Sequence, residues 1–229
     1  MPRLRYDVNT VIEKVDSAAP DPKIIERAAK LITKGEVVVC PTDTGYAFAG
    51  NALDTKAVAK VFGLKGRSFN NPIHMAAGSI EEAEKYAHID DIARQLAKRF
   101  LPGALTLVLP KKQIVPSMLV AGRNTIGIRI PNDRVILELV AKTGRPLTTT
   151  SANISGKPTP YSVEEIIADM GDGIKGIAMI LDRGPISKRE LSTIVDLTAS
   201  PPQLIRQGLI SWLEVREIIH RLQNRSDQR

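Results

Sequence analysis

The chain has 229 residues, of which 43% are hydrophobic, and its single cysteine, Cys40, excludes an internal disulfide and suits a reducing compartment. No apolar run is long enough to span a membrane and the start lacks an apolar signal segment, so we expect a cytoplasmic protein without a membrane partner. The formal net charge of +7 favours anionic partners, whereas an aromatic share of only 4% leaves few platforms for stacking unpaired bases.

Helix signals occur along the whole chain. Asp21-Pro22 is typical of a capped helix start and Gly35 of a helix end, which predicts a helix over residues 22–34. Further helix starts are predicted where an acceptor side chain precedes an apolar stretch, at Asp54, Ser79 and Ser162. A final helix is expected over about residues 212–222, followed by a short frayed tail.

Strand patterns lie between these helices. Residues 36–40 form a continuous apolar run that ends at Pro41 and predicts a buried strand. Other runs of strand length are found at residues 105–109, 125–129, 177–181, 193–197 and 203–206. Because continuous and alternating strands occur together with helices, the pattern predicts an α/β or α+β fold with a mixed sheet. We expect a single domain over residues 1–229, with its core at about 23–208.

Polar residues follow the buried strand directly. Thr42, Asp43, Thr44 and Tyr46 stand at its carboxyl end, where ligands often bind in open α/β sheets. These side chains could point into such a crevice, and they could equally be ordinary turn residues.

Two cations end the helix that begins at Asp54. Gly66 separates Lys65 from Arg67 and lets the backbone turn, so that both charges can converge on one phosphate. In the alternative interpretation the two cations only interact with the helix dipole, which stabilises a helix by about 0.3–1 kcal/mol.

Arg129 stands in the middle of a strand, between Ile128 and Ile130. An arginine is costly to bury without a partner, and a carboxylate is the natural one. The sequence leaves open whether that carboxylate is internal or belongs to a ligand.

The richest polar segment is residues 148–160, which read TTTSANISGKPTP. Four consecutive hydroxyls precede Asn153 and Lys157, more donors and acceptors than a turn needs. This composition suits phosphate or a polar small molecule, and an elaborate loop is the alternative. Ser192 and Arg206 add a hydroxyl and a cation near later strand ends, which are weak signals by themselves.

Several common sites have no signal in the sequence. The nucleotide-binding patterns G-x-x-x-x-G-K-[ST] and G-x-G-x-x-G are absent. The three histidines are scattered, so we predict no structural metal site and interpret His74 as a packing or surface residue. Ser151 has no evident histidine and aspartate partners for a nucleophilic triad.

Taken in order, the segments PTDTGY, KGR with NNP, TIGIRIP, TSANISG, STIVDL and LIRQG resemble those of the YrdC-like family, the threonylcarbamoyl-AMP synthases. The resemblance covers about residues 23–208. It implies a twisted, mixed sheet around a large basic cavity. It also implies a nucleotidyltransferase that makes threonylcarbamoyl-adenylate from L-threonine, bicarbonate and ATP. A downstream transferase complex that modifies tRNA is the implied partner, and weak binding of tRNA is compatible with the charge.

The same resemblance implies roles for individual residues. The implied ATP-binding residues are Lys65, Arg67, Asn71, Thr125, Ser151, Asn153, Thr159 and Arg206, of which Lys65 and Arg67 are also implied to be catalytic. The implied threonine-binding residues are Thr44, Arg129, Thr149 and Ser192, with Arg129 on the carboxylate. No protein metal ligand is implied, because Mg²⁺ would come with ATP and be held by its phosphates and by water.

Four positions depart from the family pattern. Gly45 replaces a bulky aliphatic residue, which predicts a looser threonine pocket. Ala76 stands where some members have histidine, Arg183 where glycine is frequent, and Gln207 where proline is usual. Two alternatives stay open. The positive charge is compatible with an RNA-binding module of the same fold without adenylate chemistry, and Gly45 and Ala76 are compatible with a diverged paralogue that uses another amine or carbamoyl substrate.

Overall fold

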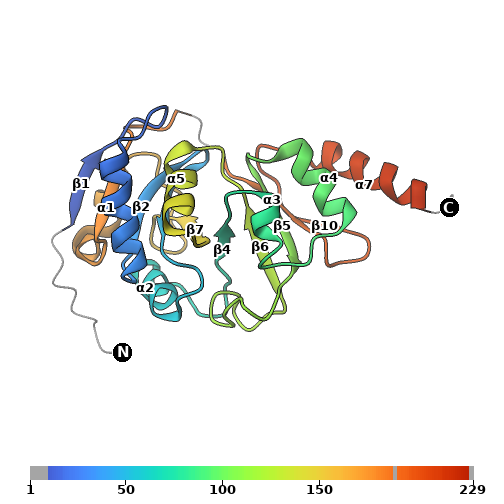
Figure 1. Cartoon of the computed structure of the whole chain (residues 1–229), viewed down its shortest axis with the longest axis horizontal. Coiled ribbons are helices and arrows are strands. Elements are labelled where there is room, and N and C mark those ends of the chain that lie inside the picture. The colour runs from blue at the N-terminus through green and yellow to red at the C-terminus, as the bar shows by residue number, and fades with distance from the viewer. Residues whose placement is uncertain (1–9, 188–189, 227–229) are drawn as a thin grey trace.

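A computed structural model of the chain describes residues 10–187 and 190–226 and contains one ten-stranded sheet (Figure 1). Its strand order is β1-β8-β2-β3-β7-β4-β6-β5-β9-β10. The strands are β1 (Val11–Lys14), β2 (Val38–Thr42), β3 (Gly45–Ala49), β4 (His74–Ala76), β5 (Leu105–Pro110), β6 (Thr125–Arg129), β7 (Leu147–Ser151), β8 (Met179–Asp182), β9 (Thr193–Asp196) and β10 (Gln203–Arg206). The sheet contains both parallel pairs, such as β4 with β6, and antiparallel pairs, such as β5 with β6, so the predicted mixed sheet is confirmed.

Helices flank this sheet, and predicted caps start four of them. They are α1 (Pro22–Thr33), α2 (Thr55–Lys65), α3 (Ile80–Ala83), α4 (Asp91–Phe100), α5 (Arg134–Thr143), α6 (Val163–Met170) and α7 (Trp212–Ser226), with a 3₁₀ helix at Gly171–Gly176. The side chains of Asp21, Asp54, Ser79 and Ser162 each accept a backbone N–H at the start of their helix. The sequence patterns missed α4 and α5. Helix α7 continues to Ser226, so the frayed tail predicted from residue 223 is wrong up to that point, and residues 227–229 lie outside the described chain.

Strand β2 differs from its prediction in both bounds. It begins at Val38 and continues through Pro41 to Thr42, because residues 38–42 pair with the unpredicted strand β3 in a tight hairpin. Proline cannot donate a backbone hydrogen bond. It is tolerated here because the pairing of β2 with β8 on its other side involves only Val38 and Val39.

Strand β7 joins the two halves of the sheet. Its first residues pair with β4, through Thr149 opposite His74, and its last residues pair with β3, through Ser151 opposite Ala47. The polar run 148–160, for which an elaborate loop was the alternative interpretation, therefore begins as a central strand. Successive hydroxyls point to opposite faces of the sheet as a result.

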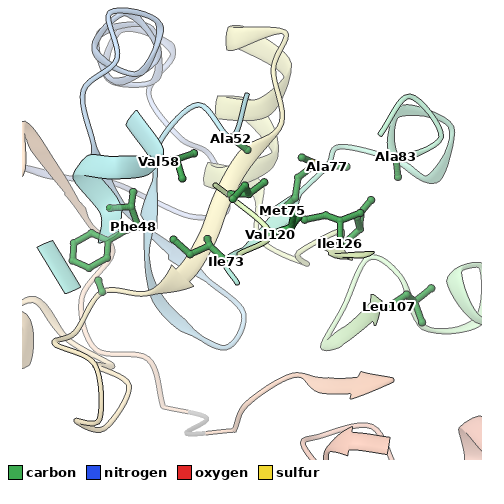
Figure 2. Packing of buried hydrophobic residues seen from close by; sticks show 14 of the residues in the cluster. Phe48, Ala52, Val58, Ile73, Met75, Ala77, Ala83, Leu107, Val120 and Ile126 are labelled. Carbon is green, nitrogen blue, oxygen red and sulfur yellow. The ribbon is translucent and has the colours of Figure 1, made fainter. Parts of the chain in front are cut away.

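Apolar side chains cover both faces of this sheet. The larger cluster includes Phe48, Val58, Met75 and Ile126, which Figure 2 shows together. A second cluster lies under α1 and α5, which contact each other (Figure 1), and includes the buried Cys40. At the other end of the molecule, α4 and α7 lie side by side. None of the described helices is long and apolar enough to cross a membrane.

Candidate active site

A polar cavity of about 420 Å³ opens on the central strands of the sheet. Ten of the twelve predicted site residues line it: Thr44, Arg67, Asn71, Thr125, Arg129, Thr149, Ser151, Thr159, Ser192 and Arg206. They come from segments spread over more than 160 positions of the chain. The fold therefore brings residues from motifs that are distant in the sequence to one cavity.

The floor of the cavity is one face of three neighbouring strands. Alternate residues line it on β5 (Thr106 and Val108), on β6 (Thr125, Gly127 and Arg129) and at β9 (Ser192, Ile194 and Asp196). Side chains two apart share a face of a strand, and the register places Val108 between Gly127 and Asp196. The floor thus has two ends, one at Arg129 and Ser192 and the other at Thr125 and Asp196.

Arg129 has an internal carboxylate partner, which answers the question that the sequence left open. Its Nη2 lies 2.5 Å from Oδ1 of Asp43, its Nε donates to the carbonyl of Gly103 at 2.9 Å, and its Nη1 donates to Oγ1 of Thr44. Only 4% of Arg129 is exposed. Burial lowers the pKa of this guanidinium, and the Asp43 carboxylate opposes that shift. A guanidinium has five N–H groups, so three bonds leave one N–H on each terminal nitrogen for a ligand.

Arg67 is oriented by the loop that follows it. Gly66 ends α2 with a φ of 55°, in the left-handed region where glycine is favoured. The Arg67 Nε and Nη2 then donate to the carbonyls of Asn71 and Pro72, at 3.1 and 3.0 Å. These two hydrogen bonds fix the orientation of the half-buried guanidinium. Its remaining N–H groups are left for an anionic ligand in the cavity.

Lys65 and Asn153 are the two predicted site residues that do not line the cavity. The Lys65 ammonium lies behind the wall, 2.5 Å from the carbonyl of Ser151 and 2.8 Å from Oδ1 of Asn153. Asn153 in turn donates to the carbonyls of Lys157 and Pro158. Burial, with the nearby Arg67 second, lowers the pKa of Lys65 to about 7. In this arrangement both residues hold the loop after β7, and a direct contact of either with phosphate stays a prediction.

Arg206 is fixed on Ser192. Its Nε and Nη2 donate to the Ser192 carbonyl at 3.0 and 2.9 Å, and Nη2 also lies 2.9 Å from the Ser192 hydroxyl. That hydroxyl lies 3.1 Å from Oγ1 of Thr106. The hydroxyl and the guanidinium, which were weak signals in the sequence, therefore act as one unit at the Arg129 end of the floor.

His74 packs inside the molecule, as one of its two predicted interpretations has it, and it also lines the cavity, which the sequence did not predict. Its ring packs on Gly127, where an added Cβ would come within 2.5 Å of the imidazole. Burial, followed by Arg206, Arg67 and Arg129, lowers the pKa of His74 to about 4. The imidazole is therefore neutral at physiological pH. Strand β4 has only three residues, which is too short for alternation to predict which way its side chains point.

Sequence patterns also missed Arg123 and Asp196. Arg123 lies in the loop before β6 and belongs to no motif. Asp196 stands in the STIVDL segment, but a single carboxylate there does not by itself indicate a ligand site. Arginines dominate the charged lining, with Arg67, Arg123, Arg129 and Arg206 against one carboxylate among the described residues. The cavity is therefore built for an anion. Within residues 10–187 and 190–226, no group of three or more His, Cys, Asp and Glu side chains could hold a metal ion.

The structure gives a physical reason for two of the four departures. Gly45 has a φ of 128°, and an added Cβ would lie 2.7 Å from Cγ2 of Thr159. Thr159 thus occupies the space that a bulky residue would need, and the looser threonine pocket stays a prediction. Ala76 is buried away from the cavity, and His74 is the histidine that reaches it.

The other two departures lie outside the lining. Arg183 donates to the Asp133 carboxylate at 2.8 Å. Asp133 caps α5, and burial raises its pKa to about 6 although Arg183 opposes the shift. Gln207 donates to the carbonyls of Gly208 and Ile210 and accepts from the first residue of α7. Both residues therefore tie elements together.

Comparison with known proteins places this cavity in a family. A model for the Sua5, YciO and YrdC proteins, described as telomere recombination, matches residues 30–208. The chain belongs to the Sua5/YciO/YrdC family. Within this family it is 40% identical over 196 residues to a threonylcarbamoyl-AMP synthase of Pyrococcus abyssi, covering 85% of this chain and 57% of that relative. It is 40% identical over 188 residues to a putative threonylcarbamoyl-AMP synthase of Methanocaldococcus jannaschii, covering 82% and 87%.

Solved structures of the family share the fold. The crystal structure of P. abyssi Sua5 complexed with L-threonine matches with a TM-score of 0.86 and 39% identity, over 92% of this chain and 61% of that one. Escherichia coli YciO matches with a TM-score of 0.77 and 26% identity, over 89% and 97%. The predicted YrdC-like fold is confirmed. The chain spans just over half the length of the P. abyssi relative and most of the M. jannaschii relative.

Proposed function

We propose that this chain makes threonylcarbamoyl-adenylate from L-threonine, bicarbonate and ATP and releases pyrophosphate. The observation that carries the proposal is the convergence of arginines, one of them buried, and of hydroxyls from eight segments on one cavity. The name of the P. abyssi relative and its threonine-bound structure support the choice of substrates.

Threonine would bind at the Arg129 end of the floor. Its carboxylate fits the two N–H groups that Arg129 does not use, one on each terminal nitrogen, in a forked pair. Thr149 and Ser192 would contact the rest of the amino acid. Asp43 holds the guanidinium in place from the other side, so the pair is oriented before the substrate arrives.

The chemistry needs charge stabilisation and no covalent nucleophile. The amine of threonine adds to CO₂ and loses a proton, which gives a carbamate. A carbamate oxygen then attacks the α-phosphorus of ATP, and the bond to the bridging oxygen of pyrophosphate breaks. Negative charge gathers on the attacking and leaving oxygens, and Arg67 and Arg206 are fixed donors suited to stabilise it. Lys65 would act through the loop that carries Ser151.

The lining also fits a Mg²⁺ ion that arrives with the nucleotide. Ser151 and Thr159 offer hydroxyl oxygens in the same lining as Arg67, and Mg²⁺ prefers hard oxygen ligands with several waters retained. Bound there with phosphate oxygens, the ion would neutralise part of the charge on the polyphosphate. We propose no protein cage for it.

The product is a mixed anhydride that must be consumed by an acyl transfer. We propose that a separate transferase complex takes the threonylcarbamoyl group from it and places it on an adenosine of tRNA. The only observation that supports binding of RNA by this chain itself is its net charge of +7. The diverged-paralogue alternative rests on Gly45 and Ala76, and it has less support because Thr159 fills the space beside Gly45 and Ala76 is buried away from the cavity.

The deciding experiment measures pyrophosphate release from ATP and bicarbonate, with L-threonine, with L-serine and without an amino acid. We expect threonine-dependent release and a product with the mass of threonylcarbamoyl-adenylate. ATP binding without threonine-dependent release would favour another amine. Salt-sensitive RNA binding without ATP binding would favour the RNA-binding module instead.

A further inference from the structure

Asp196 is the only carboxylate among the described residues that line the cavity, and four arginines line the same space. Asp196 nevertheless forms no ion pair with any described residue. Its Oδ1 accepts from the backbone N–H and the hydroxyl of Thr198, at 2.8 and 2.7 Å. Its other oxygen accepts no hydrogen bond from a described residue, so one strong acceptor is left at the cavity wall.

Apolar side chains line the cavity beside this acceptor, and Thr125 is a polar residue at the same end of the floor. Val108 is its neighbour across β5 and β9, Ile194 precedes it on the same face, and Ile205 lies on the adjoining strand. Ile205 is 57% exposed although it lines the cavity. An apolar wall with a single acceptor suits a flat heterocycle that carries an amino group.

The position of Asp196 along the floor agrees with this ligand. It lies four positions after Ser192, which is roughly 13 Å along a strand. Ser192 and Arg129 mark the end where threonine would bind, and the base of an adenylate lies on the far side of the ribose from the acyl group. The Asp196 end is therefore where the base would be placed.

We propose that Asp196 accepts a hydrogen bond from the exocyclic amino group of adenine and thereby selects ATP over nucleotides with a keto oxygen at that position. The inference rests on the proposed function, because it takes ATP to be the nucleotide. A keto oxygen would face the carboxylate acceptor to acceptor, which costs affinity. The apolar wall favours the base over the ribose as the partner of Asp196.

The test compares ATP, inosine triphosphate and 2′-deoxy-ATP in the pyrophosphate assay, with the whole chain and with Asp196→Asn. Asparagine keeps an oxygen for Thr198 and turns the free acceptor into an N–H₂ donor, which can bind the keto oxygen of inosine. We expect kcat/KM of the original chain to favour ATP over inosine triphosphate at least about tenfold, and Asp196→Asn to lower that ratio about tenfold. Asp172→Asn, at an exposed site paired with Lys175, is the matched control and should leave the ratio unchanged.

Binding of AMP and IMP by calorimetry gives the same comparison without turnover, and circular dichroism reports whether the variant folds. An unchanged ratio in folded Asp196→Asn overturns the inference. A changed ratio of ATP to 2′-deoxy-ATP, with that of ATP to inosine triphosphate unchanged, makes Asp196 a ribose ligand and also overturns it. Absence of nucleotide binding by the original chain would instead overturn the proposed function.

Discussion

The buried pair of Arg129 and Asp43 gives a prediction that the structure makes quantitative. Asp43→Ala leaves a guanidinium that is only 4% exposed without its carboxylate. Breaking a buried pair by removing one partner costs about 3–5 kcal/mol. We expect a loss near the lower end, about 3 kcal/mol, because Gly103 and Thr44 still accept from the same guanidinium.

The reverse substitution should cost less. Arg129→Met leaves Asp43, whose side chain is 20% exposed and also accepts from the backbone N–H of Asn132. Water can reach this carboxylate, so we expect a loss of about 1–2 kcal/mol. The double variant leaves no unpaired charge, so its loss should be about 2–3 kcal/mol rather than the sum, a coupling of about 2 kcal/mol.

Urea unfolding followed by circular dichroism measures all four corners of this cycle. Losses that add within about 0.5 kcal/mol would refute the reasoning, because they would show that the two charges do not depend on each other. The same variants separate stability from function. Arg129→Met should abolish saturable binding of L-threonine while ATP still binds, and threonine affinity unchanged in the folded variant would remove Arg129 from the substrate site.

Three further predictions concern the cavity wall. Gly45→Val should lower the free energy of unfolding in urea by about 2–3 kcal/mol, because Gly45 has a φ of 128° and its added side chain would meet Thr159. Gly66→Ala, at a φ of 55° and with open space around it, should lower it by about 1 kcal/mol. Equal losses of stability in the two variants would contradict the contact with Thr159. The pKa of His74 is lowered to about 4, so the unfolded chain binds the proton first and stability should fall as pH drops from about 6.5 to about 4. His74→Gln should flatten that decline in pH-dependent unfolding curves, and an unchanged slope would argue against it. Lys65→Met and Asn153→Ala should each lower kcat about a hundredfold, with the double variant little worse, because both hold one loop; losses that multiply would separate their roles.

Local signals in the sequence predicted four of the helices that begin with a polar cap and the strands with long apolar runs, but they missed α4 and α5, although Asp90 and Asp133 cap these. Asp21, Asp54, Ser79 and Ser162 are found as caps because capping depends on residues three positions apart or fewer. Strand β3 was missed because its residues, GYAFA, are stabilised as a strand by pairing on both sides and not by their own pattern. Tertiary pairing also carried β2 past Pro41, which local reasoning treated as a boundary.

The site shows a similar division. The motifs identified most of the residues that line the cavity, because a loop with more hydroxyls and cations than a turn needs indicates a ligand site. Asp196 and His74 could not be found in this way, because their importance depends on which residues lie across the sheet. Val108 opposite Asp196 and Gly127 beside His74 are known only once the strand register is known. Likewise, the sequence cannot show that the ammonium of Lys65 turns back to the loop.

Which polar groups the fold has already satisfied decides what is left for a ligand. On β7 the buried hydroxyl of Thr148 accepts from Gly50 and donates to the carbonyl of Phe48, so it serves the sheet. The side chain of Thr149, its neighbour on the opposite face, lines the cavity and makes no hydrogen bond with a described residue. Polar groups at the wall of a folded protein that lack partners gain more from a ligand than satisfied ones do. By this criterion the contacts to test first are those of Thr149, of the two spare N–H groups of Arg129 and of the free oxygen of Asp196. Lys65 and Asn153 determine where those contacts lie.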